Sequence, residues 1–189
     1  MTATGGIFGA LQRHLGRIFG YAAIAETGLL LIALGLRSSE VVNIAFLILI
    51  PRGLELSVWA LALSIIKRKA YPLKFSDVQG LARKYPVATS ALIIAHLSVA
   101  GFPLLAGFPS RLALWQELSL QSLSASLWVF LGLLGLLVAS VRTLATLVMA
   151  SDDAPWELNE TWVQTFMLGI GVLGIFLLGL FPQILQPFL

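Results

Sequence analysis

Long apolar segments alternate with short polar ones along the whole chain. A hydrocarbon core of roughly 30 Å takes about 20 residues of α-helix to cross. By that measure the predicted spans are residues 17–36, 41–66, 86–105, 124–150 and 161–181. Backbone groups in lipid must be satisfied within their own segment, and the roughly ten-residue alternation of a membrane strand does not occur. The pattern therefore predicts an all-α integral membrane protein with about five crossings.

The third span carries the triplet Gly-Phe-Pro twice. Proline interrupts the helical hydrogen-bond ladder and glycine permits a turn. The predicted helix breakers are Gly101, Pro103, Gly107 and Pro109. Segment 109–122 reaches only about 20 Å as a helix, which is too short to cross alone, and Pro109 suits the first turn of a new helix. Residues 86–122 are therefore predicted to form one discontinuous helix, broken near 101–109.

Composition supports the membrane class and excludes several functions. The chain has 189 residues, of which 58% are hydrophobic and 11% charged. Cysteine is absent, which excludes disulfides, thiolate metal sites and iron–sulfur ligation. The two histidines have no partner at metal-ligand spacing, and no fingerprint of a dinucleotide site occurs. We therefore expect no catalytic residue, no metal and no cofactor on this chain.

Basic residues are concentrated in one loop. Of the 12 Lys and Arg, half lie between Lys67 and Lys84. The positive-inside tendency places this loop in the cytoplasm, with Arg13 and Arg17 on the same side and, after five crossings, the C-terminus outside. Because the charge is confined to a loop, we expect the lipid bilayer, and not nucleic acid, as the surrounding partner.

Ionisable side chains recur inside the predicted spans, where they are costly and usually face a protein interior or a water-filled cavity. They are Glu26, Arg52, Glu55, His96, Arg111 and Arg142. Each also has an ordinary structural explanation. Arg52 and Glu55 are three residues apart and can pair on one helix face.

The remaining charges leave similar alternatives open. Glu26 has no polar partner on its own helix, so it needs one from another helix or must be neutral, and we favour a functional role for it. His96 is either part of a relay or a helix–helix hydrogen bonder. Arg142 can extend towards an interface. Mid-membrane polar groups beside a broken helix are typical of ion sites, so the residues alone indicate an ion- or proton-conducting membrane protein, or a subunit of one.

Three stretches carry a resemblance to a known family. They are "LQRHLGRIFGYAAIAETGLLLIALGL", "FSDVQGLARKYPVATSALIIAHLSVAGFPLLAGFPSRLALW" and "LGIGVLGIFLLGLFPQIL". In order and approximate spacing they resemble the antiporter-like, proton-translocating membrane subunits of NADH–quinone oxidoreductase (respiratory complex I), which are related to subunits of multi-subunit sodium/proton antiporters. The middle stretch is similar to the family pattern D-L-x-G-L…S-L-A-G-I-P-P-x-x-G-F-x-x-K and is the most specific of the three.

The resemblance covers nearly all of the chain but only the C-terminal part of a family member. It implies a single transmembrane domain over 1–189 that corresponds to the second helix repeat and the final helix, as a fragment, one half of a split gene or a truncated paralogue. It also implies partners, namely other membrane subunits and a chain that supplies the missing first repeat. The redox cofactors would then lie on other subunits, and the complex in an energy-transducing membrane, which we expect to be the plasma membrane of a bacterium.

Several positions depart from the family pattern. Arg111 occupies the place of the lysine in G-F-x-x-K, Glu55 falls where many relatives have lysine, and Glu26 replaces a His or Gln. A lysine can release its proton when buried, whereas arginine stays protonated at any biological pH. Arg111 is therefore expected to act as a fixed charge.

Two hypotheses follow. In the first, the chain is a proton-conducting subunit in which Glu26, Glu55 and His96 relay protons. In the second, it is a structural subunit whose relay has decayed, or part of a multi-subunit cation/proton antiporter. An independent small transporter is disfavoured, because five helices supply only one repeat of an inverted pair.

Overall fold

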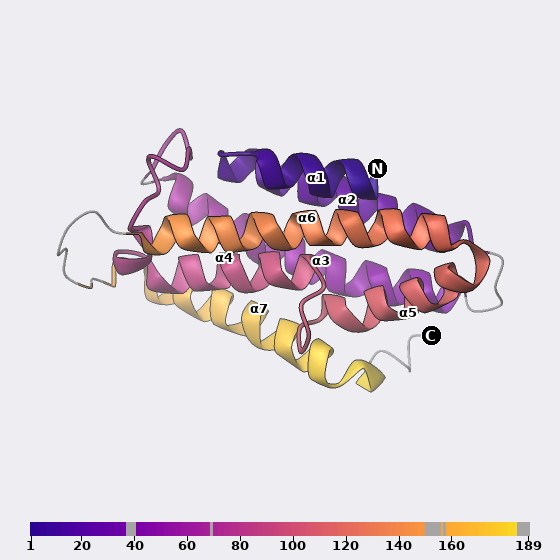
Figure 1. Cartoon of the computed structure of the whole chain (residues 1–189). Helices are drawn as coiled ribbons and strands as arrows, with labels where there is room; N and C mark the ends of the chain where they lie inside the picture. Colours follow the sequence, from indigo (N-terminus) through magenta and orange to yellow (C-terminus); the bar gives the residue numbers. More distant parts are fainter. Residues whose placement is uncertain (37–40, 69, 150–155, 157, 185–189) are drawn as a thin grey trace.

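The helices form one elongated bundle, seen from the side in Figure 1. The computed structural model describes residues 1–36, 41–68, 70–149, 156 and 158–184. The α-helices in these ranges are α1 (Thr2–Leu11), α2 (Leu15–Leu34), α3 (Val41–Lys67), α4 (Pro86–Val99), α5 (Gly107–Gln121), α6 (Leu123–Val148) and α7 (Trp162–Leu180). A short 3-10 turn, η1 (Leu81–Arg83), precedes α4.

The predicted membrane class and the discontinuous helix are confirmed. Four helices are long and apolar enough to cross a membrane, namely α2, α3, α6 and α7. With 14 and 15 residues, α4 and α5 are each too short, and together they make the fifth crossing. The third span was predicted to reach residue 105, whereas α4 ends at Val99. The other predicted and observed ends agree within a few residues, although the predicted end of the fourth span at Ala150 lies outside the described residues.

The break between α4 and α5 lies slightly earlier than predicted, because the two triplets have different roles. Gly101, with φ +81°, ends α4. Its N–H donates to the Ser98 carbonyl, and the Phe102 N–H donates to the Leu97 carbonyl, which is the Schellman arrangement that favours glycine. Gly107 instead begins α5, so the second triplet forms its first turn, where the missing N–H of Pro109 costs nothing.

The N-terminal helix α1 was not predicted, because ten residues are too few for a membrane span. It lies along α2 and α6 at one side of the bundle (Figure 1). Small residues permit this close approach: a Cβ added to Gly132 of α6 would lie 2.7 Å from the carbonyl oxygen of Thr2. Such small-residue contacts are the usual way for helices to pack within a membrane, where apolar burial gives little driving force between helices.

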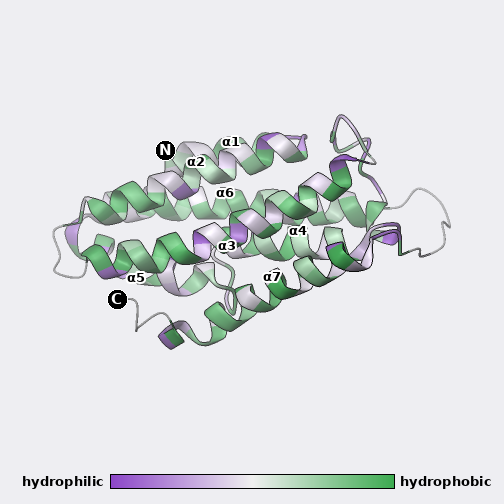
Figure 2. Ribbon diagram, turned by 180° about the vertical axis from the view of Figure 1, so that it is seen from behind, coloured by the Kyte–Doolittle hydropathy of each residue, from purple (hydrophilic) through white to green (hydrophobic). Residues whose placement is uncertain are grey.

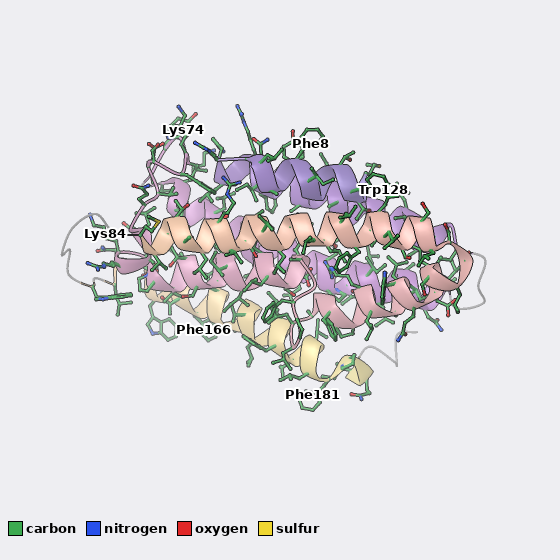
Figure 3. The ribbon with its side chains drawn as sticks, viewed as in Figure 1. Phe8, Lys74, Lys84, Trp128, Phe166 and Phe181 are labelled. Carbon is green, nitrogen blue, oxygen red and sulfur yellow. The ribbon has the colours of Figure 1, made fainter. Side chains whose placement is uncertain are left out.

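Large apolar side chains cover the outer faces of the helices. Phe8, Trp128, Phe166 and Phe181 are each at least half exposed and point away from the bundle in Figure 3. Figure 2 shows hydrophobic residues along most of the helix length, with hydrophilic residues at the bundle ends and again halfway along α3. This distribution is that of a protein surrounded by lipid, with a polar region in the middle of its interior.

The basic loop and the start of α2 lie at the same end of the bundle. His14, the N-cap of α2, forms an isolated β-bridge with Lys74, and the Phe75 N–H donates to the Arg13 carbonyl. Arg13 and the basic loop therefore lie on one side of the membrane, as the crossing number requires. That all of 1–189 forms a single domain stays a prediction, since its C-terminal end and parts of its loops lie outside the described ranges.

Candidate functional site: a buried carboxylate–arginine centre

Three charged side chains from three different helices meet in the middle of the bundle. Glu26 of α2, Glu55 of α3 and Arg111 of α5 are 1%, 0% and 6% exposed. The Arg111 guanidinium forms an ion pair with Glu26 through Nη2, and the same nitrogen lies 3.6 Å from Oε2 of Glu55. Sequence alone predicted these residues separately, and the fold brings them together.

The helix break makes room for Arg111. A Cβ on Gly101 would lie 2.6 Å from Cδ of Arg111, and one on Gly107 would meet its guanidinium and the Ser98 carbonyl. Arg111 also donates from Nη1 to the Gly107 carbonyl at 2.7 Å. The glycines of the two triplets therefore leave the space that the arginine side chain fills.

Ser98 joins the broken ends to the centre and was missed as a functional residue. Its hydroxyl donates to Oε1 of Glu55 at 2.6 Å and accepts from the Gly107 N–H at 3.1 Å. The first N–H of α5 is thereby satisfied, and the positive end of that helix is directed towards a carboxylate. The available signal was the position of this serine next to the first triplet, in the most specific of the resembling stretches.

Arg52 and Glu55 do not pair with each other, which corrects the expectation of a local pair on one face of α3. Arg52 donates from Nη2 to Oγ1 of Thr27 on α2 at 2.7 Å, and its charge acts on the neighbouring Glu26. Glu55 turns instead to Ser98 and Arg111. With both carboxylates ionised, the two arginines and two glutamates make a network without net charge. Such balance is what burial in a membrane interior requires.

His96 lies next to this centre without joining it. Its ring stacks on Trp59 with 4.2 Å between centroids, and Trp59 lies one helical turn from Glu55 on α3. His96 is fully buried, and both of its ring nitrogens lack a hydrogen-bond partner among the described residues. The alternative of a helix–helix hydrogen bonder is therefore wrong, and its packing is aromatic.

Arg142 lies elsewhere, towards the end of α6 that adjoins the basic loop. Its guanidinium donates to the carbonyl of Ala10 in α1 and lies 5.7 Å from the centroid of the Phe75 ring. The structure therefore separates the six predicted residues into a centre of four, an adjacent histidine and a distant arginine. Within the described residues, no cluster of His, Cys, Asp or Glu has the makeup of a metal site.

An apolar cavity of about 290 Å³ adjoins the Arg111 side of the centre. Its walls come from α5, α6 and the chain that leaves α4, and they include Phe108, Trp115 and Phe130. Arg111 is the charged residue that lines it, and its Nε lacks a hydrogen-bond partner. The two carboxylates lie deeper and do not line it.

The chain is similar in sequence to a subunit of NADH-quinone oxidoreductase. The chain is 29% identical over 196 aligned residues to NADH-quinone oxidoreductase subunit N of Dehalococcoides mccartyi, and this alignment covers 96% of the chain and 39% of that relative. The chain therefore spans about two fifths of that relative's length.

Two solved structures share the fold. A chain of the archaeal membrane-bound sulfane sulfur reductase superposes with a TM-score of 0.81 at 26% identity, over 94% of this chain and 30% of that one. A chain of respiratory complex I from Thermus thermophilus superposes with a TM-score of 0.83 at 17% identity, over 96% of this chain and 39% of that one.

The family model described as "NADH:quinone oxidoreductase/Mrp antiporter, TM" matches residues 2–139. This match includes α1 to α5 and most of α6, and thus the entire buried centre. The chain therefore belongs to the NADH:quinone oxidoreductase/Mrp antiporter transmembrane family.

Proposed function

We propose that the chain contributes to proton translocation as part of a membrane-arm subunit in an NADH–quinone oxidoreductase-like complex. The observation that carries this proposal is the convergence of two buried carboxylates on one arginine at a helix break. Charged groups are expensive inside a membrane and mark ion or proton pathways when they face a protein interior. Glu26 and Glu55 are the groups that can carry protons, and Arg111 supplies a permanent countercharge.

The geometry suggests how protonation of one carboxylate would move the Arg111 guanidinium to the other carboxylate. Nη2 of Arg111 contacts Glu26 and lies 3.6 Å from Oε2 of Glu55, an oxygen that has no hydrogen-bond partner among the described residues. A proton arriving on Glu26 would cancel its attraction for the guanidinium, which would then move to Glu55. Because one cation serves two acids, protonation of one favours ionisation of the other.

The other predicted pathway residues have smaller parts in this proposal. Arg52 balances the charge on the α2 side through Thr27 and Glu26. His96 adds a protonatable group that stacks on Trp59, the residue one turn from Glu55 on α3, and its place in the relay stays a prediction. Arg142 lies at the bundle end, where it would act on proton entry or exit.

The experiment is proton pumping by the reconstituted complex that contains this chain, with Glu55→Gln in place of the native residue. We expect the complex to assemble but to lose most of its pumping. Glutamine keeps the shape of glutamate but cannot take up or release a proton. Glu117→Gln is the matched control: it removes a carboxylate from α5, and Glu117 has no ion pair among the described residues. Unchanged pumping in Glu55→Gln would contradict the proposal.

A structural role is the second candidate, and one observation favours it. Both carboxylates are held by the fixed charge of Arg111, and the neighbouring cavity has mainly apolar walls. In that case the network would stabilise helix packing, and Glu26→Gln and Glu55→Gln would lower the amount of assembled complex without changing proton flux per complex. The two candidates thus predict opposite outcomes in one pair of measurements.

Partners and location form the remaining part of the proposal. We expect other membrane subunits as partners, with one chain supplying the first helix repeat, and redox cofactors on those partners only. Purification of the native complex and identification of its chains tests this.

The orientation in the membrane can be tested with Lys84→Cys, which provides a unique labelling site in a chain without cysteine. We expect an impermeant reagent to label this cysteine from the cytoplasmic side of bacterial membrane vesicles. Labelling from the other side only would contradict the proposed orientation.

A further inference from the structure

A basic pocket at the loop end of the bundle is separate from the buried centre. It has a volume of about 560 Å³ and lies between the start of α2, the loop before η1 and the last turns of α6. The lining residues are Arg13, Lys74, Phe75, Ser76, Gln79, Arg142, Ala145 and Thr146. Three of these eight are cations, and none is an acid. Figure 3 shows Lys74 at this end, on the same side of the bundle as α1.

The cations of the pocket are not neutralised within it. Among the described residues neither Arg13 nor Lys74 has a carboxylate at ion-pair distance, and both are exposed. Asp77, the acid of the same loop, accepts hydrogen bonds from the Ser76 hydroxyl at 2.9 Å and the Lys74 N–H at 3.3 Å. Among the described residues, three positive charges against this one negative charge leave the pocket with a surplus, which attracts an anion.

Arg142 forms a fixed floor for such an anion. One of its terminal nitrogens donates to the Ala10 carbonyl, and the Phe75 ring lies beside its Cζ. These contacts hold the guanidinium in place and leave further N–H groups for a ligand, because a guanidinium has five donors in a planar fork that matches phosphate oxygens. Gln79 adds a neutral donor at the rim.

The position of the pocket indicates which anion reaches it. Arg142 lies six residues before the end of α6, about 9 Å along the helix axis, so the pocket is at the depth where lipid headgroups meet the helix ends. The adjoining surface of α6 is apolar and exposed, with Val138 and Val141 at 45% and 55%. A polar pocket continuous with an apolar helix face fits a molecule with an anionic head and acyl chains. Basic pockets between membrane helices are known to take such headgroups.

We propose that this pocket binds the phosphodiester headgroup of an anionic phospholipid, with its acyl chains along the exposed face of α6. Arg13 and Lys74 close over the phosphate from the two loops, and Arg142 contacts it from below. Bound lipid would thereby join α1, α6 and the basic loop. The proposal does not depend on the buried centre, because none of its residues belongs to that centre.

The test uses native mass spectrometry of the complete native assembly, released from bilayers that contain phosphatidylglycerol and phosphatidylcholine in equal amounts. We expect phosphatidylglycerol to be retained in preference to phosphatidylcholine. Arg13→Gln and Lys74→Gln should each lower this retention about fivefold, the effect of roughly one surface cation on an anionic lipid. Both residues are exposed, so these variants are expected to fold.

Lys84→Gln is the matched control, because Lys84 is an exposed cation near the end of the same loop that does not line the pocket. Equal loss in Lys84→Gln would overturn the proposal in favour of general attraction by loop charge. Retention unchanged in Arg13→Gln and Lys74→Gln would also overturn it. Displacement of the lipid by millimolar inorganic phosphate would show a site for free phosphate instead, whereas retention in phosphate supports a lipid.

Discussion

Two arginines inside the same bundle are held in opposite ways. Arg111 is almost fully buried and is surrounded by carboxylates, whereas Arg142 is partly exposed and has a backbone carbonyl and an aromatic ring as neighbours. The difference follows from depth. A charge far from water needs a countercharge to offset its loss of solvation, but near a helix end water and headgroups perform that function.

This comparison distinguishes a candidate functional residue, Arg111, from a candidate anchoring residue, Arg142. The Arg111 centre contains carboxylates that can gain or lose a proton, so its charge can vary. The partners of Arg142 carry no charge, so its interactions are the same whatever the protonation state around them. Charged residues of one type within one membrane bundle therefore need not share a pathway.

The largest expected effect comes from removing the buried cation. Arg111→Met leaves Glu26 and Glu55 buried without their main countercharge, and breaking a buried ion pair in this way costs about 3–5 kcal/mol. Thermal unfolding in detergent, followed by tryptophan fluorescence, measures the loss. Arg111→Lys restores the charge and should recover much of the stability. A loss below that of Arg142→Gln would contradict the distinction between the two sites.

A second variant tests the space around Arg111 without touching its charge. Gly107→Ala places a Cβ against the Ser98 carbonyl and the guanidinium, and such overpacking should cost about 2–3 kcal/mol in the same unfolding assay. Gly169→Ala in α7 is the control, because a Cβ there meets nothing within 4 Å. Equal stability of the two alanine variants would show that the break does not constrain the arginine.

Arg142→Gln should have a smaller effect on stability than either change at the centre. It removes a charged hydrogen bond to the Ala10 carbonyl and the contact with Phe75 at a partly exposed site, for a loss of about 1–2 kcal/mol. Hydrogen exchange in α1 provides a second readout, because the lost contact joins α6 to this helix. Faster exchange in α1, with α3 unchanged, is the expected pattern.

The smallest effect is expected for His96→Phe. His96 is a buried polar residue that is part of neither arginine site. Phenylalanine keeps the stack on Trp59 and removes two ring nitrogens that have no described hydrogen-bond partner. Stability should therefore change by less than about 1 kcal/mol or rise slightly. Proton flux in the same variant decides whether His96 takes part in the relay, and loss of flux at unchanged stability would place it in the pathway.

The sequence by itself determined the membrane class, the five crossings and the broken helix. Apolar length specifies a span directly, since a bilayer has a fixed thickness, and proline and glycine act on the local backbone. Apolar length does not mark α1, because this helix has only ten residues. Its close contact with α6 depends on glycines that lie far apart in the chain.

Only the tertiary structure decided which charges meet. Residue spacing suggested that Arg52 pairs with Glu55, but Thr27 and Arg111 from neighbouring helices offered better placed partners. Six ionisable residues in apolar segments look alike in sequence, because depth and facing direction depend on how helices rotate and pack against one another. The separation into a buried centre, an adjacent histidine and an arginine at the bundle end is therefore a property of the packed helices and not of any single segment.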